Sequence, residues 1–328
     1  MTCTTTASAM PDAVQLPPAV SIVALPDELQ RHIFKQACNP LEPCIAVYLS
    51  GANHELWALT HEDRQQLRAD HELAVALCRR MGTSCKALRE ARRLTRLNFG
   101  LRATDLALLG TLGSVLPALE SLHLCEKSAG PDAVQQLAER LRTGALSAVT
   151  ILQFDYVYLG GMHVGDAGAS ALAAALGRGA LPRLMHLTLY NAAIGDAGLA
   201  ALAPALRRLP ALETLDLGRN LFGDDGLATL VAPAPPAVTL PTPTGVLTKL
   251  RVLNLCYTQV LDAGCVALTS ALDNGALPAL KSLYLYGIPA STSARCAVHA
   301  ALEMPVVLPR PILGGGYMGR AGWRRTWA

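Results

Sequence analysis

The stretch LMHLTLYNAAIGDAG at residues 184–198 returns 28 residues later as LETLDLGRNLFGDDG at residues 212–226. Both copies begin with the phrase L-x-x-L-x-L, whose alternation of apolar and polar residues predicts a short strand with one buried face. Related phrases begin at residues 94, 119, 149, 184, 212, 250 and 280, at spacings of 25 to 38 residues. A unit of this size cannot bury its own apolar face, so the repetition predicts a core built by stacking neighbouring units.

A second signal follows five of these phrases. From residue 195 it reads GDAGLAALAPAL, in which Ala and Leu recur at helical spacing and have high helix propensity. An aspartate opens each run, and a carboxylate there can accept free backbone N–H groups at the positive end of a helix. We expect the following residues at helix N-caps or in first turns: Asp132, Asp166, Asp196, Asp224 and Asp262. Each repeat is therefore predicted to be strand, loop and helix.

The combined pattern resembles the ribonuclease-inhibitor-like class of leucine-rich repeats, over roughly residues 94 to 303. The resemblance implies an α/β solenoid, a horseshoe of about seven strand-helix repeats with a parallel concave sheet and convex helices, preceded by a small helical region. The asparagine position of this class, eight residues after the first Leu, holds Asn220 in one repeat but Ala192 and Thr258 in others. Because of these replacements, irregular turns are expected. A Pro-rich insertion at residues 232–249 reads as an exposed loop, with a docking segment as the alternative.

Strand alternation also predicts which side chains face the concave side of the sheet. Tyrosine is frequent among them, and five of the eight tyrosines of the chain fall on this face. Tyr buries a large area at low entropic cost and keeps a hydroxyl group for hydrogen bonding, which favours it at protein interfaces. The predicted partner-binding residues are His123, Tyr156, Tyr190, Asp216, Arg219, Asn254, Tyr257, Tyr284 and Tyr286. The alternative explanation is that Tyr simply suits β-strands.

The N-terminal third carries the stretch VALPDELQRHIFKQACNP at residues 23–40. Its apolar spacing after a proline predicts a short amphipathic helix. The stretch resembles the opening of an F-box, which implies docking to the ubiquitin-ligase subunit Skp1. The matching residues are Leu25, Pro26, Glu28, Leu29, Ile33 and Phe34. Residues 41–70 intervene before a segment at 71–88 that could serve as the second helix, and a helical cap that closes the solenoid is the alternative.

Composition bounds the remaining organisation. We expect a disordered N-terminus at 1–20, a helical region at 21–90, the repeat domain at 91–303 and a disordered basic tail at 304–328. A net charge of +3 gives no field for nucleic acid. Nine scattered cysteines favour free thiols in a reducing compartment, and no segment reads as a membrane span, so we expect a cytoplasmic monomer, with the nucleus as an alternative location.

The sequence contains no phosphate-binding G-K-[ST] motif, no close Cys/His pair for a metal and no nucleophile with its base. We therefore expect no enzyme activity, no cofactor and no metal. The leading hypothesis is a non-enzymatic interaction protein that holds a partner on its concave face, in a sharper version the substrate-recognition subunit of an SCF-type ubiquitin ligase. The alternatives are a regulator of a small GTPase, in which Arg219 would be the contact residue, and a structural repeat protein without a dedicated partner.

Overall fold

The computed structural model describes residues 22–95, 101–124, 132–141, 143–154, 164–232 and 247–302. Tyr156, both predicted disordered ends and most of the insertion at 232–249 lie outside these residues. The chain forms two compact units, Met1–Glu72 and Leu73–Ala328. The boundary between Glu72 and Leu73 falls inside a continuous helix, α4 (His61–Arg80). No residue breaks this helix before Gly82, which takes the left-handed conformation with φ +64°.

The first unit is a small helical bundle around one aromatic residue. Phe34 is fully buried and packs with Ala46 and Leu67. Residues 41–70, which the sequence placed between two F-box-like helices, contain α2, α3 and the start of α4. The helix expected to begin at residue 71 is α4, which begins at residue 61. The elements are η1 (Ile22–Ala24), α1 (Asp27–Ala37), α2 (Cys44–Gly51), α3 (His54–Leu59) and the first part of α4.

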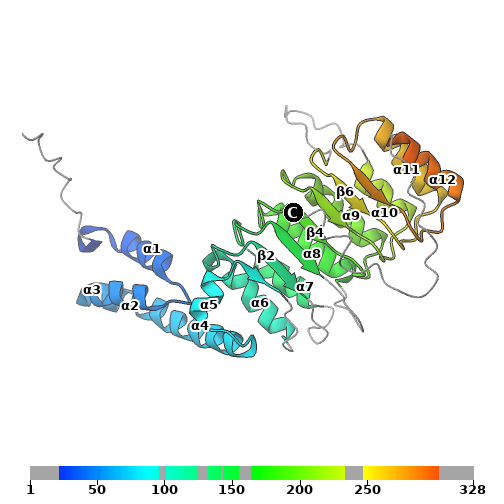
Figure 1. Cartoon of the computed structure of the whole chain (residues 1–328). Helices are drawn as coiled ribbons and strands as arrows, with labels where there is room; N and C mark the ends of the chain where they lie inside the picture. Colours follow the sequence, from blue (N-terminus) through cyan, green and yellow to red (C-terminus); the bar gives the residue numbers. More distant parts are fainter. Residues whose placement is uncertain are drawn as a thin grey trace, which may run out of the picture. The chain divides into compact units, whose positions relative to one another are not determined.

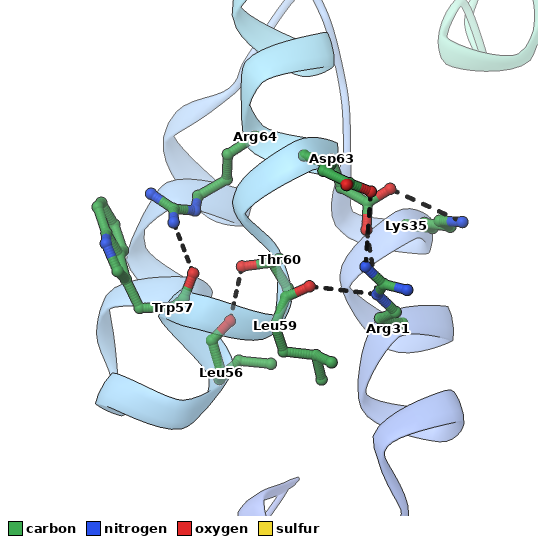
Figure 2. A network of polar contacts seen from close by, with 9 residues as sticks. Arg31, Lys35, Leu56, Trp57, Leu59, Thr60, Asp63 and Arg64 are labelled. Carbon is green, nitrogen blue, oxygen red and sulfur yellow. Dashed lines mark hydrogen bonds and ion pairs between the residues drawn. The ribbon is translucent and has the colours of Figure 1, made fainter.

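Polar contacts tie α1 and α3 to the start of α4 (Figure 2). Asp63 of α4 lies 3.9 Å from the Nε of Arg31 and 3.7 Å from the Nζ of Lys35, both on α1. Arg64, the next residue of α4, places its guanidinium carbon 3.3 Å from the centroid of the Trp57 ring and donates to the Trp57 carbonyl oxygen at 2.6 Å. The pairs on Asp63 are partly exposed and contribute little energy each, so they orient helices that the apolar core holds together.

The second unit is built on a parallel sheet of seven strands in chain order, β1 to β7. The middle leucine of each repeat pairs with the next across the sheet, from Leu122 to Leu283, and every one of them is buried. In the first repeat, Leu94 takes this place, so the phrase that seemed to begin at residue 94 is three residues out of register. In the frame of the structure the phrase reads ARRLTR, with Ala91 where the other phrases have Leu or Val and Arg96 where they have Leu or Phe, whereas LTRLNF from residue 94 fits the pattern. The strands are β1 (Arg93–Leu94), β2 (Ser121–Leu124), β3 (Ile151–Phe154), β4 (His186–Thr188), β5 (Thr214–Asp216), β6 (Val252–Asn254) and β7 (Ser282–Tyr284).

A helix follows each described strand, and each helix of the series packs against the next along one side of the sheet (Figure 1). This arrangement confirms the predicted α/β solenoid. Five of the helices follow the predicted aspartates, while the first and last of the series form without the G-D-x-G motif. The helical elements are α5 (Cys85–Glu90), α6 (Ala103–Leu112), η2 (Gly113–Val115), α7 (Ala133–Arg140), α8 (Gly165–Gly177), α9 (Asp196–Arg207), α10 (Asp224–Val231), α11 (Asp262–Asp273) and α12 (Thr292–Ala301).

The aspartates lie at the helix starts, but four of their carboxylates serve the following repeat. The Oδ1 atom of Asp196, in the first turn of α9, accepts from the N–H groups of Gly223 and Gly226 at the start of α10, both at 2.8 Å. We call this contact the carboxylate joint. Equivalent bonds of 2.6 to 2.7 Å join Asp166 to Gly195, Asp224 to Leu261, and Asp262 to Ser291. A carboxylate thus neutralises the positive start of the next helix.

The second glycine of the motif makes room for the carboxylate joint. A Cβ atom on Gly226 would lie 2.6 Å from the Oδ1 of Asp196 and 3.2 Å from its Cα. Gly198 and Gly264 stand in the same relation to the aspartates of the repeats before them. In the motif G-D-x-G, the aspartate therefore accepts hydrogen bonds from the next repeat. The second glycine leaves space for the aspartate of the previous repeat.

Asn220 stabilises the turn of the fifth repeat from inside. Its side chain is 1% exposed and accepts from the N–H groups of Ala192 and Ile194 at 3.1 and 3.0 Å. It donates to the carbonyl oxygens of Leu189 and Leu217 at 2.8 Å. At the equivalent place in the sixth repeat, a threonine hydroxyl makes one bond of 2.8 Å to a carbonyl oxygen of its own turn. The described turns are irregular in the way the sequence suggested.

Candidate interaction surface on the concave sheet

The predicted concave residues differ in exposure. Tyr257, Tyr284 and Tyr286 are 42%, 46% and 51% exposed, and Arg219 is also exposed. Tyr190 and His123 are half-buried, whereas Asp216 and Asn254 are each only 6% exposed. The exposed residues come from the last three repeats. We call Arg219, Tyr257, Tyr284 and Tyr286 the aromatic patch.

Tyr257 is held by its neighbours in the last repeat. Its backbone is left-handed, with φ +58°, and its N–H donates to the carbonyl oxygen of Tyr286 at 2.8 Å. Its ring lies against the Cα of Gly287, where a Cβ would meet a ring carbon at 2.5 Å. The ring centroid is 5.2 Å from that of Tyr286, and the two planes meet at 88°, an edge-to-face arrangement. Partial burial and then the hydrogen bond with Tyr286 raise the pKa of Tyr257, so the phenol is neutral at physiological pH.

Arg219 occupies the same position one repeat earlier. Its backbone is left-handed, with φ +56°, and its N–H donates to the carbonyl oxygen of Cys256 at 2.7 Å. The guanidinium carbon lies 5.2 Å from the centroid of the Tyr257 ring, within the range of a cation–π contact. No acidic side chain among the described residues forms an ion pair with Arg219.

Asp216 and Asn254 support the surface from below. The amide of Asn254 donates to the carboxylate of Asp216 at 2.9 Å, and that carboxylate also accepts from the N–H of Gly218 at 3.0 Å. The Tyr190 ring covers Gly218, where a Cβ would lie 3.0 Å from two ring carbons. These contacts link three successive repeats. Because Asp216 and Asn254 are buried and bonded to each other, they position the strands and offer little surface to a partner.

The F-box-like residues lie on different sides of α1. Phe34 is fully buried in the helical bundle, while Leu29 and Ile33 are 49% and 36% exposed. Pro26 is the N-cap of the helix, and Glu28 is exposed in its first turn. Leu25 is half-buried, and its carbonyl oxygen accepts from a buried glutamine side chain at 2.8 Å. Four of the six residues, Pro26, Glu28, Leu29 and Ile33, are therefore exposed, whereas Leu25 is half-buried and Phe34 is buried.

Sequence reasoning missed a second group of exposed apolar residues in this unit. On α2, Ile45, Val47 and Tyr48 are 53%, 44% and 80% exposed. Their segment read as an insertion between two helices, so its apolar composition was given no role. The available signal was the run CIAVYL, which is apolar on every side of the helix and so must expose some of its residues.

The described residues hold no group of three His, Cys, Asp or Glu side chains that could bind a metal ion. The seven cysteines in this part of the structure are free. Among the described helices, none combines the length and the apolar character that a membrane crossing requires.

A family model described as "Leucine Rich repeat" matches residues 209–231, which span the turn with Asn220 and α10. No curated protein matches the chain at the level of sequence. Similar solved structures include the tropomodulin C-terminal domain of Caenorhabditis elegans, at 20% identity, a TM-score of 0.32, and coverage of 43% of this chain and 76% of that chain.

The Rad7 and Elc1 complex of yeast is similar at 12% identity and a TM-score of 0.30, covering 76% of this chain and 78% of that chain. An internalin of Listeria monocytogenes is similar at 16% identity and a TM-score of 0.28, covering 59% and 62%. The seven parallel strands, each followed by a helix, form an α/β solenoid, and the residues that match the leucine-rich-repeat model lie in its fifth repeat.

Proposed function

We propose that this chain is a non-enzymatic interaction protein that binds a protein partner through the aromatic patch. The observation that carries the proposal is the combination of exposure and fixation at this patch. Tyr257 is 42% exposed, yet Gly287, Tyr286 and Arg219 fix its ring. A side chain that is already ordered loses little entropy on binding, and Tyr and Arg are the residues most often found at energetic centres of interfaces.

The proposal is tested by recovering partners with the full chain and with a variant carrying Tyr257→Ala and Tyr284→Ala. We expect partner recovery to fall sharply while the melting temperature changes little, because both side chains are nearly half exposed and lie outside the apolar core. Val266→Ala is the matched control, since Val266 is 63% exposed but lies on α11 on the helix side of the sheet. Equal recovery with all three proteins would exclude the aromatic patch as the binding surface.

A specific observation also favours the sharper role of an SCF-type substrate receptor located in the cytosol or nucleus. Leu29 and Ile33 lie one turn apart on α1 and are exposed, while Phe34 fixes the helix to its bundle. Exposed apolar side chains at this spacing fit an apolar groove of a partner such as Skp1. In this arrangement the helical unit would hold the ligase and the aromatic patch would hold the substrate.

The sharper role is tested with purified Skp1 and the full chain. Leu29→Asp combined with Ile33→Asp removes the exposed apolar pair and leaves the Phe34 core intact, and His32→Ala is the control at an exposed position between them. We expect the wild type and the control to bind Skp1 and the double variant not to bind. If the wild type fails to bind, the ligase role is excluded and the proposed role of the aromatic patch stands.

A further inference from the structure

The charges on the concave side of the last three repeats are unbalanced. Glu213, the acidic residue at the start of the fifth strand phrase, lies 3.6 Å from Arg251 of the next repeat, and this pair neutralises both. Asp216 is buried and bonded within the sheet. Arg219 and Lys281 are exposed, and neither forms an ion pair with an acid of the described residues. Among the described concave side chains of these repeats, Arg219, Arg251 and Lys281 are exposed and no acid is, so the surface offered to a partner is positive.

Arg219 is presented in a form suited to a carboxylate. The guanidinium carbon lies over the Tyr257 ring, 5.2 Å from its centroid, and the left-handed backbone is fixed by its bond to Cys256. A cation–π contact at this distance does not occupy the N–H groups of the guanidinium. A pair of these N–H groups matches the two oxygens of a carboxylate and can bind both.

The spacing of the aromatic patch limits the shape of a partner. Arg219, Tyr257 and Tyr286 belong to three successive repeats, and neighbouring strands of a sheet lie about 4.8 Å apart. The patch therefore extends across about 10 Å, which an extended chain covers in about three residues at roughly 3.3 Å per residue. Because side chains of an extended chain alternate between two faces, an acidic side chain on Arg219 would place the side chain two residues away over the tyrosines.

We propose that the aromatic patch recognises an extended acidic segment of a protein, with an Asp or Glu carboxylate on Arg219 and an apolar side chain on the rings of Tyr257, Tyr284 and Tyr286. This inference rests on the proposed function of the patch and adds the chemistry of its partner. The carboxylate supplies the charge that the concave side lacks, and the apolar side chain covers rings that are nearly half exposed.

The test is a selection of random 12-residue peptides displayed on phage, carried out with the full chain as the target. The wild type is expected to enrich peptides with an acidic residue two positions from a large apolar one. Synthetic peptides with Glu replaced by Gln, and the variant Arg219→Gln, should each weaken binding about tenfold or more, as expected for a hydrogen-bonded charge pair. Arg208→Gln is the control, because Arg208 is an exposed arginine at the end of α9 on the helix side.

The outcomes separate this inference from the proposal on which it rests. Acidic peptides that lose affinity with Arg219→Gln but not with Arg208→Gln support it. If the selected peptides lack acids, or bind the Arg219→Gln variant equally well, but lose affinity with Tyr257→Ala, the inference is overturned and the binding role of the patch stands. If no peptide is enriched, or if Tyr257→Ala leaves all affinities unchanged, both are overturned.

Discussion

The carboxylate joint between α9 and α10 provides a measurable test of how the repeats hold together. In Asp196→Ala, the N–H groups of Gly223 and Gly226 lose their acceptor. Water can replace the bond to Gly223, which is exposed, but the bond to Gly226 is partly buried. Hydrogen bonds to a charged group contribute about 1.5–3 kcal/mol each, so with one of the two compensated we expect a loss of about 2–3 kcal/mol.

The measurement is the melting temperature, followed by circular dichroism. For a folded unit of this size, 1 kcal/mol corresponds to about 2–4 °C, so Asp196→Ala should lower the midpoint by about 4–12 °C. Asp225→Ala is the control, since Asp225 is an exposed acid in the first turn of α10 that takes no part in the carboxylate joint. Its loss removes only a favourable charge near a helix start, worth about 0.3–1 kcal/mol. Equal effects of the two substitutions would refute the joint.

A double-mutant cycle tests the space under the same joint. Gly226→Ala alone should destabilise, because its Cβ would lie 2.6 Å from the Asp196 carboxylate, and overpacking of this kind costs about 1–3 kcal/mol. With Asp196→Ala present, the oxygen is gone and the clash is largely relieved. The double variant should therefore be more stable than the sum of the two single losses by at least about 1 kcal/mol, whereas additivity within about 0.5 kcal/mol would contradict the geometry.

Three further predictions concern buried groups. Phe34→Ala should cost about 3–5 kcal/mol and expose the helical unit to limited proteolysis, whereas Ile33→Ala should leave the cleavage rate nearly unchanged. Asn220→Ala should cost about 3 kcal/mol in urea unfolding, because two buried N–H groups lose their acceptor, and a loss under about 1 kcal/mol would contradict this. Burial and then the hydrogen bond with Cys85 raise the pKa of Cys78 to about 12 from 9.0, so this thiol should stay unreactive toward a disulfide reagent at pH 8 while exposed Cys44 reacts. Because the folded state holds the Cys78 proton more tightly than the unfolded state does, the free energy of unfolding should fall as the pH rises from 9.0 to about 12.

The repeat order and the parallel sheet could be predicted from the sequence because each repeat contains both a strand pattern, L-x-x-L-x-L, and a helix pattern of Ala and Leu. The hydrogen-bond partners of the aspartate carboxylates, which lie in the following repeat, could not be predicted. Asp196 is the first residue of its own helix, but the distance from its oxygen to the N–H group of Gly226 is set by how α9 and α10 stack. Only the second glycine of the motif hinted at this contact, since a glycine inside a helix start costs stability unless space is needed there.

The binding residues show the same limit. Ile33 and Phe34 are neighbours in one apolar stripe, but Ile33 is exposed and Phe34 is buried. This difference depends on where α2 and α4 pack against α1, which the stripe alone does not specify. Strand alternation predicts that Asp216 and Asn254 face the concave side. They are nevertheless buried, because a carboxylate and an amide on adjacent strands bond each other instead of water.

The carboxylate joint also explains how this protein can vary in length. Its bonds connect residues that are 27 positions apart at Asp196, 29 at Asp166 and Asp262, and 37 at Asp224, yet their lengths stay between 2.6 and 2.8 Å. The link between Asp224 and Leu261 spans the Pro-rich insertion and is made as well as the others. Residues added between a helix and the next strand therefore leave the connection between successive helices unchanged. New segments can be acquired, trimmed or exchanged at that point, and an engineered chain could carry a grafted peptide there without altering the rest of the solenoid.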